Sequence, residues 1–272
     1  MELLDRTAAS PQVVGMVHLP PLPGSPGFVG GRASIRERAL EDATTLVEGG
    51  VDGLLVENFG DAPFYPDSVP PHVVAELASI TTTLTDAVDV PVGVNVLRND
   101  ATAALSVAAA ASAAFVRVNV HVGAAATDQG LLEGRAHETL RLREQIDADL
   151  SILADVHVKH ATPLGEASLE RATREVIERG RADGVIVSGA GTGLETALED
   201  VERVADTVTA LERSVPVFVG SGVTGDSVCD LLEAGADGAI VGTALKEGGE
   251  TTNPVSLESV RDLVSVVDGR RV

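Results

Sequence analysis

Lysine, aromatic side chains and positive charge are scarce in this 272-residue sequence. Lys159 and Lys246 are the only lysines among 20 basic residues, against 41 aspartates and glutamates. The net charge of −21 would repel nucleic-acid phosphates and anionic lipid headgroups, so neither is expected as a partner. The carboxylates are spread through predicted helices rather than gathered in a tail. That spread favours a halophilic protein in a cytosol of high salt, where ions screen the repulsion, over an ordinary acidic protein.

Cysteine and long apolar runs are also missing. Cys229 is the single cysteine, so no disulfide framework is expected and a reducing compartment fits. No apolar stretch approaches the roughly 20 uncharged residues that span a bilayer. The first residues lack the basic region and long apolar run of a signal peptide. Together these absences predict a soluble, cytoplasmic protein that does not bind membranes.

Short β-rich runs alternate with longer amphipathic stretches along the chain, a pattern typical of parallel βα units. In the stretch 34–48, for example, the apolar residues recur at helical spacing. Eight such units without a composition break predict one domain, a (β/α)8 TIM barrel over residues 1–272, rather than an open doubly wound sheet. The expected strands are 12–18, 53–58, 91–97, 115–120, 151–158, 184–188, 216–221 and 238–242.

Three of the connections that follow strands are long, namely 19–33, 59–70 and 121–134. TIM barrels place their chemistry on the face that carries these connections. Four of the six aromatic residues lie in the first two of them, and either a lid over substrate or a small satellite core would account for that. These four are Phe28, Phe59, Phe64 and Tyr65.

Strand parity predicts a polar pocket at the same end of the barrel. Residues two apart on a strand share a face, so Asp155, His157 and Lys159 oppose the apolar set that contains Ala154 and Val156. The polar set should therefore point into the barrel. Buried polar groups need partners, so a ring of them is better explained by a functional pocket than by packing. The same parity adds His18, Glu57, Asn95, Arg117 and Asn119, with Lys246 just beyond the last strand.

Several chemical roles are open to this ring. A carboxyl or imidazole group in a pocket can be tuned toward neutral pH and then transfers protons. The catalytic candidates are Glu57, Asp155, His157, His18 and Lys159, the last by a Schiff base or by anion binding. Arg117 is expected either to bind substrate, as Asn95 and Asn119 are, or to serve as a counter-ion to Glu57 or Asp155. The two histidines and two carboxylates also supply ligand types for a divalent metal, without a compact motif.

Glycine-rich sequences follow the last three predicted strands. Glycine lets backbone N–H groups approach an anion closely, and barrels often build a phosphate site from the loops after strands seven and eight. Tight turns that require positive φ are the alternative. The predicted phosphate-binding residues are Ser188, Gly191, Gly193, Gly220, Ser221, Gly222, Gly242, Thr243 and, as a nearby cation, Lys246.

Four stretches carry a family resemblance: 14–26 (VGMVHLPPLPGSP), 56–64 (VENFGDAPF), 127–136 (TDQGLLEGRA) and 154–160 (ADVHVKH). In these the chain resembles the BtpA/SgcQ family of ribulose-phosphate-binding-like barrels, over nearly its whole length. The resemblance implies a TIM barrel, and in its matching stretches we assign Asn58, Asp128, Gln129 and Arg135 to substrate binding. Ser256 stands where the family's Asn-Pro-Val-Asp ends in an acid, which leaves the role of that acid open.

Two classes of function follow. The first is an enzyme that acts on a small phosphorylated metabolite, a sugar or nucleoside phosphate, as an isomerase, lyase or hydrolase. The second is a non-catalytic assembly or regulatory factor, since the resemblance includes cyanobacterial members linked to photosystem I accumulation. Some members are labelled phosphoribosylanthranilate isomerase, which uses a cysteine acid where this chain has His18; we disfavour that activity. A homo-oligomer is also possible.

Overall fold

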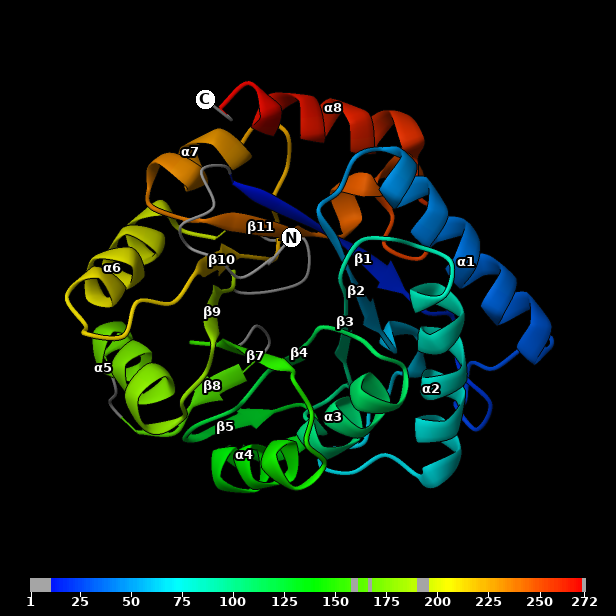
Figure 1. Cartoon of the computed structure of the whole chain (residues 1–272), viewed down its shortest axis with the longest axis horizontal. Coiled ribbons are helices and arrows are strands. Elements are labelled where there is room, and N and C mark those ends of the chain that lie inside the picture. Colours follow the sequence, from blue (N-terminus) through cyan, green and yellow to red (C-terminus); the bar gives the residue numbers. More distant parts are fainter. Residues whose placement is uncertain (1–10, 158–160, 166–167, 190–195, 271–272) are drawn as a thin grey trace.

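The computed structural model describes residues 11–157, 161–165, 168–189 and 196–270. Its centre is a closed barrel of parallel strands in the order β1-β11-β10-β9-β7-β4-β3-β2 (Figure 1). The predicted TIM barrel is thereby confirmed, and each expected strand appears within three residues of its predicted ends. The barrel strands are β1 (Gln12–His18), β2 (Gly53–Glu57), β3 (Val92–Asn95), β4 (Phe115–Val118), β7 (Ser151–Asp155), β9 (Gly184–Val187), β10 (Val217–Val219) and β11 (Gly238–Val241).

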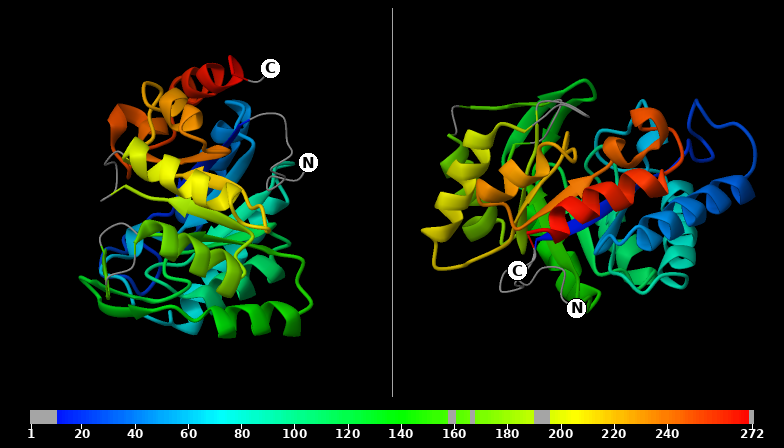
Figure 2. Two further views of the ribbon diagram at one scale, coloured as in Figure 1. Left: turned by 90° about the vertical axis from the view of Figure 1, so that its left-hand side faces the viewer. Right: turned by 90° about the horizontal axis from the view of Figure 1, so that it is seen from above.

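Helices cover the outside of the barrel in all views (Figures 1 and 2). The α-helices are α1 (Arg32–Glu48), α2 (Pro71–Thr85), α3 (Ala101–Ala110), α4 (Ala136–Gln145), α5 (Leu169–Arg174), α6 (Leu198–Thr209), α7 (Val228–Glu233) and α8 (Leu257–Asp268). Local chemistry sets several starts: α2 opens on a proline, and the Asp100 side chain accepts the Ala103 N–H at 2.8 Å to cap α3. α5 continues as a π-helix, Glu175–Arg179, and 3₁₀ turns cover Phe59–Asp61, Thr243–Leu245 and Glu247–Gly249. Within the described ranges, none of these helices is both long and apolar enough to cross a membrane.

The core has two layers, as strand parity requires. One lies between strands and helices and contains Val13, Val17 and Ala154; the other fills the barrel interior. Gly93 makes room in that interior, because a Cβ there would lie 2.2 Å from the ring of Phe115. The interior is therefore packed up to the level where polar side chains begin. Its members are Val14, Met16, Leu55, Phe115, Leu153, Ile186, Phe218 and Ile240.

An antiparallel sheet that the sequence did not predict lies beside the barrel mouth. Its strands, in the order β6-β5-β8, are β5 (Ala124–Thr127), β6 (Gly130–Glu133) and β8 (Ala161–Pro163). The segment 121–134 was expected to be a loop. Of β5 and β6, only Ala125 and Leu132 are buried, so the run carries no alternating apolar pattern. The hairpin turn depends instead on Gly130, whose φ of 105° favours glycine.

Candidate active site at the barrel mouth

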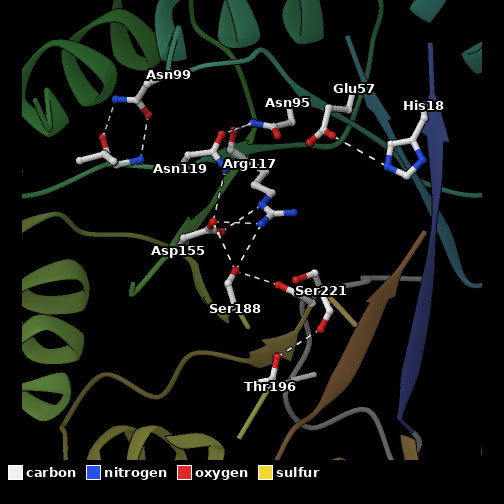
Figure 3. Close-up of polar contacts among 12 residues, drawn as sticks. His18, Glu57, Asn95, Asn99, Arg117, Asn119, Asp155, Ser188, Thr196 and Ser221 are labelled. Carbon is white, nitrogen blue, oxygen red and sulfur yellow. Dashed lines mark hydrogen bonds and ion pairs between the residues drawn. The ribbon is translucent and has the colours of Figure 1, made fainter. Parts of the chain in front are cut away.

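The carboxyl ends of the barrel strands bring polar side chains from six strands together (Figure 3). Strand parity predicted this convergence for every member except Ser188, because each stands in phase with inward-facing residues of its strand. All of them except His18 and Ser188 are less than 4% exposed. The members are His18 (β1), Glu57 (β2), Asn95 (β3), Arg117 and Asn119 (β4 and its end), Asp155 (β7) and Ser188 (after β9).

Arg117 and Asp155 form the centre of this ring. The guanidinium Nε and Nη2 each donate to one carboxylate oxygen at 2.9 Å, a bidentate geometry. Asp155 Oδ2 also accepts the Asn119 amide at 3.3 Å and lies 3.5 Å from Ser188 Oγ. Asn95 in turn donates to Asn119 Oδ1 at 3.0 Å. Of the roles left open for Arg117, the structure therefore shows a counter-ion to Asp155.

Glu57 and His18 form a second pair that is far less constrained. Glu57 Oε1 lies 3.9 Å from His18 Nε2, and this oxygen has no hydrogen-bond partner among the described residues. The imidazole packs against the ring of Phe59 at a centroid distance of 4.9 Å. On another side it faces Gly242, where a Cβ would lie 2.6 Å from His18 Cε1. His18 therefore packs closely against its neighbours, while Glu57 keeps a buried oxygen that has no hydrogen-bond partner among the described residues.

Arg98 is a member of the mouth that the sequence reading missed. It is 4% exposed, and its backbone N–H donates to the Tyr65 carbonyl at 3.0 Å. Burial lowers its pKa, which the charges of Asp155 and Glu57 partly restore. Burial acts on Arg117 too, but Asp155 and Glu57 outweigh it and the pKa of Arg117 is raised. Two arginines thus balance two buried carboxylates. Parity could not find Arg98, because it stands three residues past the end of β3.

His157 lies just beyond the polar ring, on the wall of a cavity. β7 ends at Asp155, and His157 lines a side cavity of about 210 Å³ together with Asp155 and Asn119. The charges that act on the ring are Asp200 and Arg203 of α6, which lies outside the barrel. Burial lowers the pKa of His157, which keeps the imidazole neutral near pH 7. His157 therefore lines the same cavity as Asp155, and its catalytic role stays a prediction.

The predicted phosphate loops lie at the ends of the neighbouring strands β9, β10 and β11. Ser188 Oγ donates to the Gly220 carbonyl at 2.8 Å, and Thr196 Oγ1 donates to the Ser221 carbonyl at 3.2 Å. These bonds tie the first two loops together, and Gly222 adopts a φ of 73°. Phosphate binding here stays a prediction, carried by Ser188, Gly220, Ser221, Gly222, Gly242 and Thr243. Gly191, Gly193 and Lys159 lie outside the described residues.

Lys246 does not join these loops. The 3₁₀ turn Thr243–Leu245 carries the chain outward, and Lys246 Nζ donates to Asp42 Oδ2 on α1 at 2.8 Å. Asp42 Oδ1 accepts the Val255 N–H at 2.9 Å. Lys246 is 2% exposed; burial lowers its pKa, against the attraction of Asp42. The structure corrects its predicted place as an anion clamp: its ammonium joins α1 to the segment before α8.

The four residues assigned from the family stretches lie around the ring rather than in it. The structure corrects the assignment of Asn58 to substrate binding. Its side-chain amide bonds to both the N–H and the carbonyl of Leu97 and so joins the ends of β2 and β3. Asp128 and Gln129 form the β5–β6 turn, and Arg135 lies at the start of α4, 3.7 Å from Asp67. Among the described residues, no three of the His, Cys, Asp or Glu side chains form a group that could hold a metal ion.

The fold and the polar mouth define a TIM-barrel protein with its candidate site at the carboxyl ends of the strands. The chain belongs to the BtpA family, whose model matches residues 9–269. It is 47% identical over 262 residues to the photosystem I biogenesis protein BtpA of Synechocystis, covering 95% of this chain and 90% of that protein. It is 49% identical over 255 residues to an uncharacterised protein of Thermococcus kodakarensis, with coverages of 93% and 94%.

Solved structures agree on the architecture. Thiamine phosphate pyrophosphorylase from Pyrococcus furiosus superposes with a TM-score of 0.59 at 16% identity, covering 97% of this chain and 98% of that one. Phosphoribosyl anthranilate isomerase from Thermus thermophilus gives 0.57 at 12% identity, with coverages of 95% and 98%. At such low identities these likenesses show the fold alone.

Proposed function

We propose that this protein is an enzyme that transfers protons on a small phosphorylated metabolite at the barrel mouth. The observation that carries the proposal is the 1% exposed Glu57, whose Oε1 faces His18 without a hydrogen bond from the described residues. A buried polar atom that lacks a partner costs folding free energy. Such a group is expected where it serves a ligand rather than the fold.

The ring divides into parts with different roles. His18 and Glu57 are the proton-transfer pair, since both stand at strand ends and one carboxylate oxygen has no hydrogen-bond partner among the described residues. Asp155, fixed by Arg117, orients Asn119 and contributes fixed charge near the reacting atoms. The substrate's phosphate lies at the loops after β9, β10 and β11. The position of those loops supports this, as do the fold neighbours whose names contain a phosphorylated compound.

The test is a screen of phosphorylated sugars and nucleotides by phosphorus and proton NMR, with Glu57→Gln beside the wild type. We expect the wild type to convert at least one compound, and Glu57→Gln to bind it with unchanged fold but without turnover. Glu48→Gln, a carboxyl change at an exposed position on α1, should behave as the wild type. Turnover that survives in Glu57→Gln would contradict the proposed role, as would a wild type that binds no phosphorylated compound.

A non-catalytic assembly role is the second candidate. It is favoured by the name of the Synechocystis relative, which matches 95% of this chain. The two functions differ in their dependence on the mouth chemistry. If the cellular phenotype of a deletion is restored equally by wild type, Glu57→Gln and Asp155→Asn, the role is not catalytic.

We also propose that the protein works in a cytoplasm of high ionic strength. Its net charge of −21 supports this, because self-repulsion destabilises a compact state unless ions screen it. Screening length falls from about 10 Å at 0.1 M salt to about 3 Å at 1 M. The thermal unfolding midpoint should therefore rise steeply over that KCl range. A flat or falling midpoint would exclude a salt requirement.

A further inference from the structure

We propose that the side cavity next to β7 binds the planar base of a nucleoside phosphate. This rests on the proposed function only for the phosphate end of the ligand. The cavity holds about 210 Å³, below the roughly 300–1,000 Å³ of pockets for drug-sized ligands. It therefore suits one ring system, not a whole nucleotide. The remainder of the ligand must lie outside it, toward the barrel mouth.

Apolar side chains line the cavity from two elements, and we call the space between them the slot. The accessory sheet supplies one wall with Ala125 of β5 and Pro163 of β8. The helix that follows β8 supplies the other with Ala172 and Val176. Apolar walls on two sides of a small cavity match the faces of a heterocycle, which proteins commonly hold between apolar side chains.

His157 provides the hydrogen-bonding edge. It is half-buried on the cavity wall, and its Nε2 is a buried atom that has no hydrogen-bond partner among the described residues. A neutral imidazole donates from one nitrogen and accepts at the other, as the edge of a base requires. Two of the three charged residues of the lining, Arg171 and Glu175, pair with one another at 3.0 Å at the more exposed lip, and the third, Asp155, pairs with Arg117. The cavity thus offers little to an anion and suits a neutral polar ring.

The backbone around the slot supports a binding role. Helix α5 turns into a π-helix at Glu175, and both Glu175 and Val176 line the cavity. π-helical turns are rare and frequently mark functional sites. His121 Nε2 lies 2.8 Å from the Gly180 carbonyl, which links the end of the π-helix to the base of the β5–β6 hairpin. Both walls are therefore anchored to each other.

The cavity and the polar ring share two residues, Asp155 and Asn119. On its other side Asp155 approaches Ser188, whose Oγ contacts the Gly220 loop. In space, the slot comes first, then Asp155 and Asn119, and then the glycine-rich loops. A nucleoside monophosphate has the same order of parts: base, ribose and phosphate. Its ribose would lie between the slot and the loops, near the partly exposed Ser188 hydroxyl, which can bond a ribose hydroxyl.

The experiment measures binding of AMP, CMP, adenosine and ribose 5-phosphate to the full chain by calorimetry. In the wild type at least one nucleotide should bind tenfold or more tightly than ribose 5-phosphate. Ala172→Phe, which places a ring in the slot, should remove that advantage and weaken adenosine by the same factor. Ribose 5-phosphate should change less than twofold. Ala109→Phe adds the same ring at another half-buried helical alanine, on α3 outside the cavity, and should change nothing.

The outcomes separate this inference from the proposed function. Equal binding of nucleotides and ribose 5-phosphate overturns the base slot and leaves a phosphate site intact. If adenosine binds the wild type and its binding is lost in Ala172→Phe, the base slot is supported. This holds even if ribose 5-phosphate does not bind, a result that would contradict the phosphate site. If Ala172→Phe does not fold, Ala161→Phe fills the slot from β8 instead. Unchanged nucleotide affinity in a folded slot-filling variant also overturns the inference.

Discussion

Arg117 and Asp155 face each other from the neighbouring strands β4 and β7 in a bidentate ion pair whose side chains are 3% and 0% exposed. Asn119 and Ser188 contact the same carboxylate, so the pair organises one half of the barrel mouth. Taking two charges out of water is costly, and such a pair is balanced only while both partners are present.

Removing one partner should therefore lower the free energy of unfolding more than removing both partners does. Arg117→Met is expected to lower the free energy of unfolding by about 3–5 kcal/mol, because Asp155 is left buried and uncompensated. The double variant Arg117→Met/Asp155→Leu should recover much of that loss. Urea unfolding measures each species in a double-mutant cycle. Arg261→Met, which breaks the exposed pair with Glu48, is the control and should change stability little. Additive losses would contradict this picture.

Lys246→Met tests the reassignment of the buried lysine. The substitution leaves Asp42 with Arg38, at 3.1 Å, as its remaining charged partner, so unfolding should become easier by about 1–3 kcal/mol. Affinity for ribose 5-phosphate should stay within twofold of wild type, because the Lys246 ammonium binds Asp42 of α1 and does not contact the glycine-rich loops. Both quantities come from one purified variant. A tenfold loss of affinity at unchanged stability would restore the anion-clamp role.

Gly242→Ala should act on His18 by steric contact alone. A Cβ added at Gly242 would lie 2.6 Å from His18 Cε1. We expect a loss of about 1–3 kcal/mol in stability, typical of overpacking, with weakened ligand binding. The double variant with His18→Ala should regain the stability.

The matched control is Gly225→Ala, where an added Cβ meets no atom within 4 Å. The thermal unfolding midpoint of Gly225→Ala should equal that of the wild type. If both glycine variants lose equal stability, the cause lies in the loops generally and not at His18.

Acidification should destabilise the protein through His121. This residue is 1% exposed, and burial lowers its pKa, although its bond to the Gly180 carbonyl opposes the shift. Below about pH 6.5 the unfolded state therefore binds a proton that the native state does not. The free energy of unfolding should fall with decreasing pH by up to about 1.4 kcal/mol per unit from this group.

His121→Gln keeps an N–H donor for Gly180 and cannot titrate. Urea unfolding between pH 7.5 and 5 should give a shallower slope for this variant than for the wild type, the remainder including His157, whose pKa is also lowered. Parallel curves for the two proteins would show that His121 protonates equally in both states.

The barrel could be predicted from the sequence because hydrophobic alternation within each strand is a local signal. Leu153 and Asp155 face inward as their spacing predicts, and so do Glu57 and Arg117. That signal stops where the strand stops. It did not identify Arg98, which lies three residues beyond the end of β3. The accessory sheet was missed because its pairing lies between segments far apart in the chain, β5 and β8.

By itself, then, the sequence determined the eight βα units, the inward polar residues on their strands and the excess of negative charge. Which polar residues pair was decided only by the closed barrel, since partners such as Arg117 and Asp155 come from different strands. The two lysines of the chain show this difference most plainly. Lys159 lies outside the described residues, and Lys246 looked like a site cation from its place after a strand. In the folded chain it pairs with Asp42, 204 residues away, because burial requires a counter-charge and α1 provides one.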